Sequence, residues 1–364
     1  MTKALKTRQI CFFYIALLPV IKMFTVPSFL ARICGEDAWL SALINSLTDI
    51  LVVAILYFTL KDLPCDFFTA LERRFGKGFS KAVICFYLVF FLLKTVMPMN
   101  EEKEYVELTL YMTSPNIFTF MPVFIAVIYL SSLKLRVIGR VADGVFFIAI
   151  LGYLFMFVLA LNSTDLTAIL PVGAHGTDIL KGAYQSASWF NDGAYFLFFT
   201  GEYVKGKKDG LKIILSCLLG GVIVSAFSIV FYGTFTSVAF RRGFALTEIS
   251  KYTTAINNME RFDYLPIFAL LFTSVFSLAL PFYFATELLT RLLPVKRPLS
   301  AVITALPAVI LLLFFNEYFA SVETFITRYA PAYFIAFGSV FPIIFALILK
   351  LSKNKEYGYE IYES

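Results

Sequence analysis

The stretch IALLPVIKMFTVPSF (residues 15–29) decides how this chain folds, because Pro19 interrupts an apolar run that also carries Lys22 near its middle. Proline removes a backbone donor and clashes with the carbonyl four residues earlier. At membrane depth such a break is tolerated where neighbouring groups or a cavity satisfy the freed backbone. A lysine there costs about 2.5–3.5 kcal/mol unless it faces a polar interior. A simple proline kink is the alternative, but Lys22 favours a break that faces a central cavity.

The composition indicates that this stretch lies in a membrane. Hydrophobic residues make up 59% of the 364 positions and charged residues only 15%, a balance that excludes a soluble globular enzyme. Disorder, coiled coil and collagen are excluded as well, since they need high charge, heptads or a glycine period. The whole chain, residues 1–364, is expected to form a single polytopic, all-α membrane domain.

A second polar interruption, SASWFNDGAYF (residues 186–196), lies in another apolar run. Asn and Asp compete with the helix for backbone groups, and Gly193 relaxes the chain. The alternative is a helix that begins at Gly193, but the run from there to Val204 is too short to span a membrane. Paired interruptions in two halves of a chain indicate a transporter-like site built from broken helices. The residues expected to bind the ligand are Pro19, Val20, Ile21, Lys22, Ser188, Trp189, Asn191, Asp192 and Gly193.

Ten apolar runs approach the roughly 20 residues that a helix needs to cross a bilayer. Five belong to a first repeat, about residues 9–161, and five to a second, about residues 182–351, with a short cytoplasmic tail at 352–364. Five is odd, so the second repeat enters from the opposite side and the two are inverted. The predicted spans are Gln9–Ile33, Asp37–Leu60, Phe79–Met97, Ile117–Leu133, Val141–Leu161, Gly182–Val204, Leu211–Val238, Tyr264–Leu289, Leu299–Phe315 and Ala332–Leu351.

Lysine and arginine concentrate in the loops on one side of these spans. Short basic loops stay in the cytoplasm, whereas acidic residues contribute little to orientation. Most of the 31 basic residues then lie inside, and both termini are predicted to be cytoplasmic. The net charge of +6 therefore reports topology and does not indicate nucleic-acid binding.

Further polar residues inside the spans could line the same cavity. Asn45 and Asp49 are four residues apart, hence on one helix face, and Asp49 is a candidate partner for Lys22. That pair could replace a bound cation, or the lysine could titrate and couple to protons. Lys94 is expected to extend outward, toward the acidic residues that follow its span. The hydroxyls expected to face the first helix are those of Thr273, Ser274 and Ser277.

Enzymatic and metal-binding motifs are not found in the sequence. His175 is the only histidine, so no His-based triad or HExxH motif exists, and the five cysteines lack CxxC spacing. Gly220 and Gly221 are interpreted as small residues for close helix packing. No catalytic residue, metal site or cofactor is expected.

Three segments carry a resemblance to a known family. They are TRQICFFYIALLPVIKMFTVPSFLARICGEDAWLSALI (residues 7–44), LTAILPVGAHGTDILKGAYQSAS (residues 166–188) and MERFDYL (residues 259–265). Their order and spacing resemble the spore-germination permeases, the B subunits of nutrient germinant receptors. The resemblance implies the amino acid/polyamine/organocation superfamily and the inverted five-plus-five fold of the leucine transporter type, with broken first and sixth helices. It also implies a small-molecule site between helices 1, 3, 6 and 8.

The same resemblance implies A-type and C-type receptor subunits as partners and the spore inner membrane as location. Superfamily members commonly have a glycine-containing stretch where this chain has Pro19 to Lys22. The glycine-free stretch of this chain, with its lysine, would obstruct the space where a substrate carboxylate usually binds. Three functions follow as hypotheses: a receptor subunit that binds a nutrient, with an amino acid as first candidate; a proton- or cation-coupled amino acid transporter; and a membrane scaffold without ligand. Receptor and transporter share a fold, so the fold does not separate them.

Overall fold

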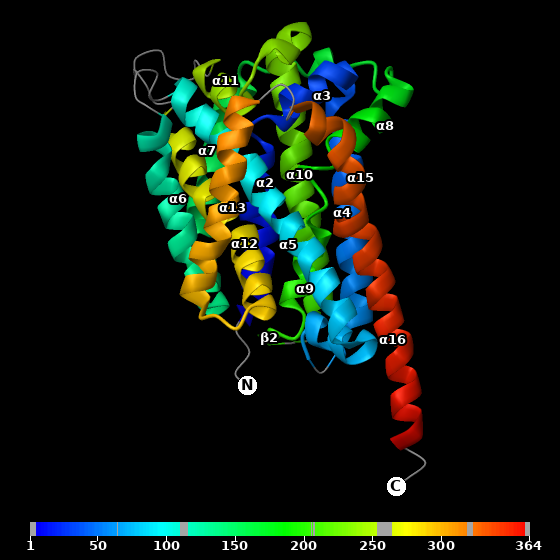
Figure 1. Ribbon diagram of the computed structural model, residues 1–364. Coiled ribbons are helices and arrows are strands. Elements are labelled where there is room, and N and C mark those ends of the chain that lie inside the picture. The colour runs from blue at the N-terminus through cyan, green and yellow to red at the C-terminus, as the bar shows by residue number, and fades with distance from the viewer. Residues whose placement is uncertain are drawn as a thin grey trace.

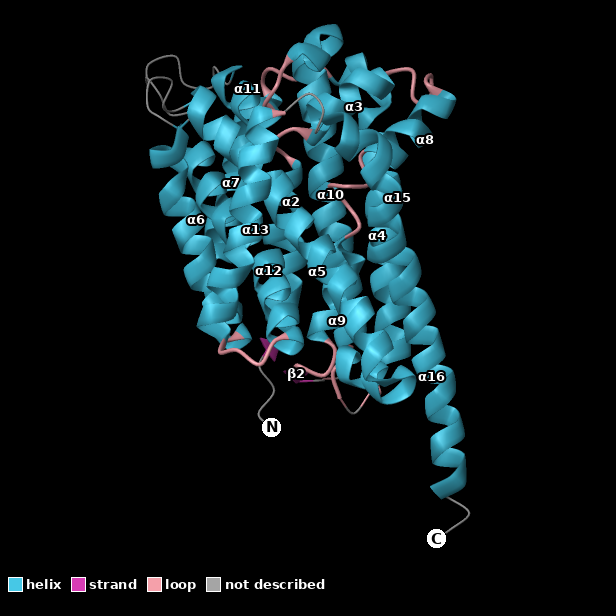
Figure 2. Ribbon diagram, viewed as in Figure 1, coloured by secondary structure: helices cyan, strands magenta, loops and turns pink. Residues whose placement is uncertain are grey.

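Apolar runs between charged loops form the long helices of a single bundle (Figure 1). The computed structural model describes residues 5–63, 65–109, 116–204, 206, 208–252, 264–318 and 323–360, and most of the MERFDYL motif lies outside them. Figure 2 shows that these residues are almost entirely helical. The long helices are α4 (Ala38–Leu60), α5 (Phe67–Thr109), α6 (Asn116–Ser132), α7 (Leu135–Leu161), α10 (Asp209–Phe235), α12 (Tyr264–Leu292), α13 (Arg297–Glu317) and α16 (Phe341–Glu360).

Seven helical segments in the described residues are long and apolar enough to cross a membrane, and an eighth, Phe120–Ser132, is shorter. The first and sixth spans are divided into pieces, which is why neither counts as a continuous crossing helix. The tenth span runs through two π-helical turns, η6 (Phe325–Tyr329) and η7 (Ala336–Val340), on either side of α15 (Ala330–Ile335), into α16. The chain therefore has the predicted ten-span, all-α organisation.

The first span consists of α1 (Thr7–Phe12), a π-helical turn η1 (Phe13–Leu17), α2 (Leu18–Lys22) and α3 (Val26–Cys34). The break lies at residues 23–25, just beyond the Pro19–Lys22 stretch that was predicted to contain it. Pro19 occupies the first turn of α2, where a missing N–H group costs little, and the wider π turn before it relieves the clash with the preceding carbonyl. Proline therefore starts a short helix at this point and does not itself make the gap.

The sixth span consists of α8 (Gly176–Gln185), a non-helical segment, a 3₁₀ turn η4 (Asp192–Tyr195) and α9 (Phe196–Phe199). Asn191 adopts a left-handed conformation with φ of 63°, which asparagine tolerates better than most residues. The predicted interruption is thus present at the predicted residues. The remaining short elements are η2 (Gly35–Asp37), η3 (Leu166–Ile169), η5 (Thr236–Arg241) and α11 (Ala245–Tyr252).

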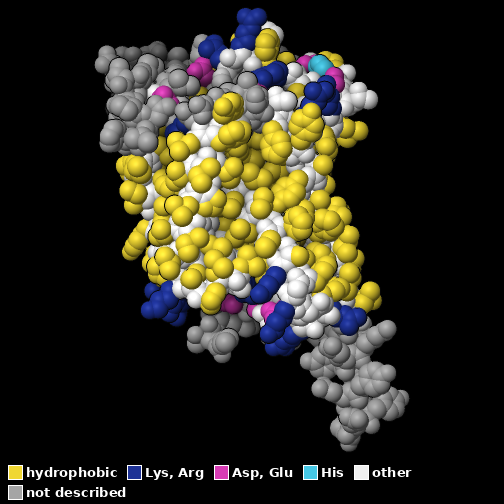
Figure 3. Space-filling view, in the orientation of Figure 1, with side chains coloured by type: hydrophobic (Ala, Val, Ile, Leu, Met, Phe, Trp, Pro, Cys, Tyr) yellow, Lys and Arg dark blue, Asp and Glu magenta, His cyan; other side chains and the backbone are white. Residues whose placement is uncertain are grey.

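The two ends of the bundle differ in structure. β1 (Leu5–Lys6) and β2 (Tyr203–Val204) pair in parallel at one end, and α3, α8 and α11 lie at the other (Figure 1). Hydrophobic side chains cover the middle of the face shown in Figure 3, and Lys and Arg gather at both ends. We call the β1–β2 end the inner end and the opposite end the outer end, following the orientation predicted from the basic loops.

Gly220 allows α10 to lie against the π turn of the first span. A Cβ atom at this position would lie 2.2 Å from the carbonyl oxygen of Tyr14, a backbone atom that cannot rotate away. We expect Gly220→Ala to destabilise the protein by about 1–3 kcal/mol, the usual cost of overpacking. Gly144→Ala in α7 is the matched control, since nothing lies within 4 Å of its Cβ position. Unfolding of both purified variants measures the difference, and equal stabilities would contradict the close approach.

Candidate functional site

Four buried charged residues meet where the first and sixth spans are broken. Lys22 at the end of α2 donates to Asp192 Oδ2 at 2.5 Å, and Lys94 of α5 donates to Asp192 Oδ1 at 3.0 Å. Asp49 of α4 accepts from the Gly193 backbone N–H at 3.2 Å. The exposed fractions of Lys22, Lys94, Asp192 and Asp49 are 7%, 3%, 2% and 7%. We call these four residues the central charge cluster.

The cluster pairs Lys22 with Asp192, whereas the sequence suggested Asp49 as a candidate partner. Asp49 is on the same α4 face as Asn45, as predicted, but its carboxylate caps the backbone of the sixth span. Asn45 likewise binds that span, since it donates to the Ala183 carbonyl and to Ser186 Oγ, both at 2.9 Å. One face of α4 therefore fixes both sides of the interruption.

The expectation for Lys94 was wrong, because its ammonium points inward. Besides Asp192, it donates to the carbonyls of Trp189 and Phe190, which belong to the non-helical segment of the sixth span. Carbonyls freed by a broken helix need donors when they are buried. A lysine on the neighbouring helix supplies them in this bundle, so snorkelling toward the outer end does not occur.

Three carbonyls of the first span accept hydrogen bonds from neighbouring elements. Ser277 Oγ donates to the Leu17 carbonyl at 2.6 Å, Tyr153 to the Ala16 carbonyl at 2.6 Å, and the Ala245 N–H to the Phe24 carbonyl at 2.8 Å. Of the three hydroxyls expected to face the first helix, only Ser277 binds it. Ser274 donates to Glu102 and to its own helix, and Thr273 bonds only its own helix.

Other predicted site residues surround the sixth-span break. Asn191 Nδ2 donates to the Ala187 carbonyl at 2.8 Å, and its Oδ1 accepts from Ser339 at 2.6 Å. Ser188 donates to the Ile326 carbonyl at 2.8 Å. These bonds tie the break to the tenth span, so Asn191 and Ser188 position backbone in this conformation, and neither lines the three cavities described below.

The cavity beside the central charge cluster is too small for a nutrient. It measures about 20 Å³ and is lined by Pro19, Lys22, Asp49 and Asp192, together with Tyr14, Leu18, Ser46, Cys217, Gly220 and Gly221. That volume accommodates about one water molecule. Val20 and Ile21 are buried and line neither this cavity nor the two larger ones at the ends of the bundle. The predicted central ligand site is occupied by ion pairs.

A larger cavity, the outer pocket, opens toward the outer end. It measures about 320 Å³ and is lined by residues of α3, α5 and the segments that lead into the eighth and tenth spans. Trp189 is the one predicted ligand residue among them. The polar and aromatic lining of the outer pocket also includes Thr25, Phe29, Arg32, Asn100, Glu101, Glu104, Phe244, Phe315 and Glu323. Sequence reasoning missed Glu101 as a site residue because the predicted third span ended at Met97, whereas α5 continues to Thr109. An ionisable residue inside a membrane span is a signal of a functional site, and a longer predicted span would have included Glu101.

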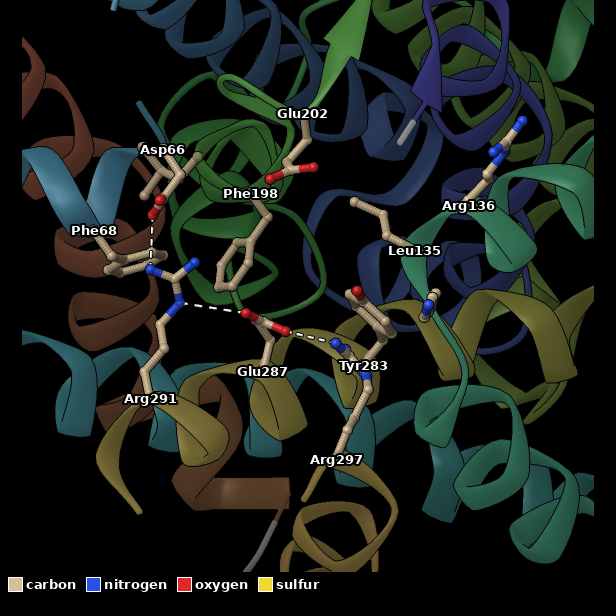
Figure 4. Close-up of a pocket in the computed structure, with 12 residues that line it drawn as sticks. Asp66, Phe68, Leu135, Arg136, Phe198, Glu202, Tyr283, Glu287, Arg291 and Arg297 are labelled. Atoms are coloured by element: carbon tan, nitrogen blue, oxygen red, sulfur yellow. Dashed lines mark hydrogen bonds and ion pairs between the residues drawn. The ribbon is translucent and has the colours of Figure 1, made fainter. Parts of the chain in front are cut away.

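A third cavity, the inner pocket, measures about 390 Å³ at the opposite end (Figure 4). Arg291 bridges Asp66 at 2.7 Å and Glu287 at 3.4 Å, and Arg297 binds Glu287 at 2.6 Å. Burial raises the pKa of Asp66, but Arg291 and hydrogen bonds from Thr69 more than offset it, so the pKa lies below its usual value. The network joins the start of α5 to the end of α12 and the start of α13.

A family comparison decides the classification of the chain. The model of the family described as spore germination protein matches residues 4–322. The chain belongs to that family. The resemblance found in the three sequence segments is thereby confirmed, and the comparison with curated proteins gave no match.

Solved structures show the fold of this spore germination protein. MhsT in complex with L-phenylalanine is similar with a TM-score of 0.59 and 13% identity, over 95% of this chain and 97% of that one. Two point mutants of the Eremococcus coleocola manganese transporter give TM-scores of 0.52 and 0.53 at 12% and 11% identity, over 92% of this chain and 78% of theirs. The predicted transporter fold of the leucine transporter type, with broken first and sixth helices, is confirmed.

Proposed function

We propose that this spore germination protein is the B-type membrane subunit of a nutrient germinant receptor. In this proposal it binds a small nutrient, with an amino acid as the first candidate, and passes a conformational signal to A-type and C-type subunits. It would lie in the spore inner membrane with both termini in the cytoplasm, and residues 9–161 and 182–351 would form its two repeats. The family membership and the transporter fold support the proposal.

The observation that carries it is the position of Trp189 between the outer pocket and the central charge cluster. Its indole lines the pocket and donates to Glu101 at 2.5 Å, while its backbone carbonyl accepts from Lys94 at 3.3 Å. Asp192, three residues later, holds both buried lysines. A ligand that moves Trp189 would therefore shift the segment where the first, third and sixth spans meet. This movement is a route from ligand binding to the signal.

The alternative is a proton- or cation-coupled amino acid transporter, with Lys22 or Asp192 in the coupling role. The shared fold favours it, and MhsT carries L-phenylalanine in its solved complex. A substrate that crossed this chain would have to separate the Lys22–Asp192 and Lys94–Asp192 pairs, which fill the centre of the bundle. Breaking buried pairs is costly, so the cluster favours signalling over passage.

Germination of spores that carry a Trp189→Leu variant tests the receptor role. Removing an anchor aromatic typically costs 2 kcal/mol or more, so we expect the nutrient concentration for half-maximal germination to rise by about 30-fold. Trp39, the only other tryptophan and no part of the outer pocket, gives the matched control Trp39→Leu. Unchanged germination with Trp189→Leu would contradict the receptor role.

Uptake of labelled amino acid into proteoliposomes separates receptor from transporter. Accumulation by the wild type that is lost in Lys22→Met would favour the transporter. The scaffold hypothesis predicts that Trp189→Leu, Lys22→Met and Asp192→Asn change neither nutrient response nor uptake.

A further inference from the structure

The outer pocket carries an excess of negative charge. Three carboxyl groups line it, those of Glu101, Glu104 and Glu323, against the single guanidinium of Arg32. Arg32 is already paired with Glu323 at 3.0 Å, and both of these residues are partly exposed at the rim. The pocket therefore offers carboxylates to a ligand and has its one cation engaged.

Glu101 is the acidic group with the least compensation. Its two oxygens accept from Thr25 Oγ1 and from Trp189 Nε1, each at 2.5 Å, and both donors are neutral. Among the described residues, no lysine or arginine forms an ion pair with it. Glu104, by contrast, has the ammonium of Lys103 among its electrostatic partners. A partly buried carboxylate held only by neutral donors is a site that a cation would stabilise.

Asn100 adds an acceptor that lacks a donor in the described part of the chain. The residue lines the pocket and is 4% exposed, and its Oδ1 has no hydrogen-bond partner. Its Nδ2 donates to Glu104 at 2.8 Å, which fixes the amide orientation because a flip would place two oxygens together. A buried acceptor without a donor is costly. Its oxygen has almost no surface open to the pocket, so a ligand N–H group would satisfy it once the side chain turns toward the pocket.

Aromatic rings form the apolar part of the pocket wall. Phe29, Trp189, Phe244 and Phe315 line it, and the rings of Phe29 and Trp189 lie 5.2 Å apart. Aromatic faces attract cations and also bind apolar groups. We infer that the outer pocket binds a small ligand with a primary ammonium group, which engages Glu101 and Asn100 while its apolar part contacts these rings. This inference rests on the proposed nutrient site and names the chemical group that the site recognises.

Charge-selective probes test this inference on the purified full-length protein. Each common amino acid is offered as its methyl ester, which keeps the ammonium, and as its N-acetyl derivative, which keeps the carboxylate. Binding is measured by the rise in unfolding temperature with probe concentration. We expect at least one ester to bind at least 10-fold more tightly than its N-acetyl partner. Glu101→Gln should weaken the binding of that ester by about 10-fold to 100-fold.

Glu72→Gln is the matched control, because Glu72 is exposed and lies at the far end of α5 from the outer pocket, before the non-helical Gly76. It should leave ester binding unchanged. An N-acetyl derivative that binds as tightly as its ester, or ester binding that survives Glu101→Gln, overturns the ammonium inference while the proposed nutrient site stands. If no probe of either charge binds, both the inference and the outer pocket as the nutrient site fail.

Discussion

Replacing Asp192 with asparagine should destabilise the protein by about 3–5 kcal/mol, the range for removing one partner of a buried ion pair. The carboxylate of Asp192 holds two ammonium groups, at 2.5 Å from Lys22 and 3.0 Å from Lys94, and all three residues are buried. Asparagine keeps the size of the side chain but leaves both lysines facing a neutral amide. Natural proteins are stable by about 5–15 kcal/mol, so this single change removes a large share of the total.

Unfolding of the purified variant in detergent measures this loss, and Asp143→Asn is the control for the same substitution. Asp143 binds Arg8, whose side chain is 61% exposed, so we expect its loss to cost about 0–1 kcal/mol. Adding Lys22→Met to Asp192→Asn removes one uncompensated ammonium and should restore part of the stability. Equal stabilities of Asp192→Asn and Asp143→Asn would show that the central charge cluster does not hold the bundle together.

The fold could be predicted from the sequence because a bilayer allows very few structures to cross it. Apolar length and the two interruptions gave ten spans, since a bilayer admits helices whose backbone groups are satisfied. The exact place of the first break did not follow. Pro19 suggested a gap at residues 19–22. The π turn at Phe13–Leu17 instead lets Pro19 lie in the first turn of α2 without a clash, and the gap lies at residues 23–25. Local insertions of this kind depend on tertiary partners, such as Ser277 and Tyr153, that the local sequence does not reveal.

The site was only partly predictable. The sequence identified the polar residues of both breaks, and Lys22 is buried beside an acidic side chain as expected. It did not show that these residues satisfy one another and leave little space, because pairing depends on which helix faces meet. Lys94 and Glu101 are on the same long helix α5 seven residues apart, yet one reaches the central charge cluster and the other the outer pocket. Hydropathy alone treats both as charges near the end of a span.

Lys94→Met should be the most damaging change in the central charge cluster after Asp192→Asn. Methionine is similarly long and apolar, so the packing of α5 is nearly kept while the ammonium is lost. The Trp189 and Phe190 carbonyls then remain buried without the donor that Lys94 provides, at about 1–3 kcal/mol each. Removing the buried ammonium also removes its desolvation cost, so we expect a net loss of about 2–4 kcal/mol. Asp192 keeps Lys22, which is why the effect should be smaller than that of Asp192→Asn.

The segment that Lys94 holds also carries Trp189, so the nutrient response should weaken more than stability alone explains. Lys81→Met, at an exposed position of the same helix, is the matched control and should change neither property. Unfolding of both variants, with germination of spores that carry each one at equal protein level, separates the two effects. A Lys94→Met protein that unfolds earlier but still responds at the wild-type nutrient concentration would assign Lys94 to stability alone. In that case the signal would have to leave the outer pocket by the tenth span, through the Ser188 bond to the Ile326 carbonyl.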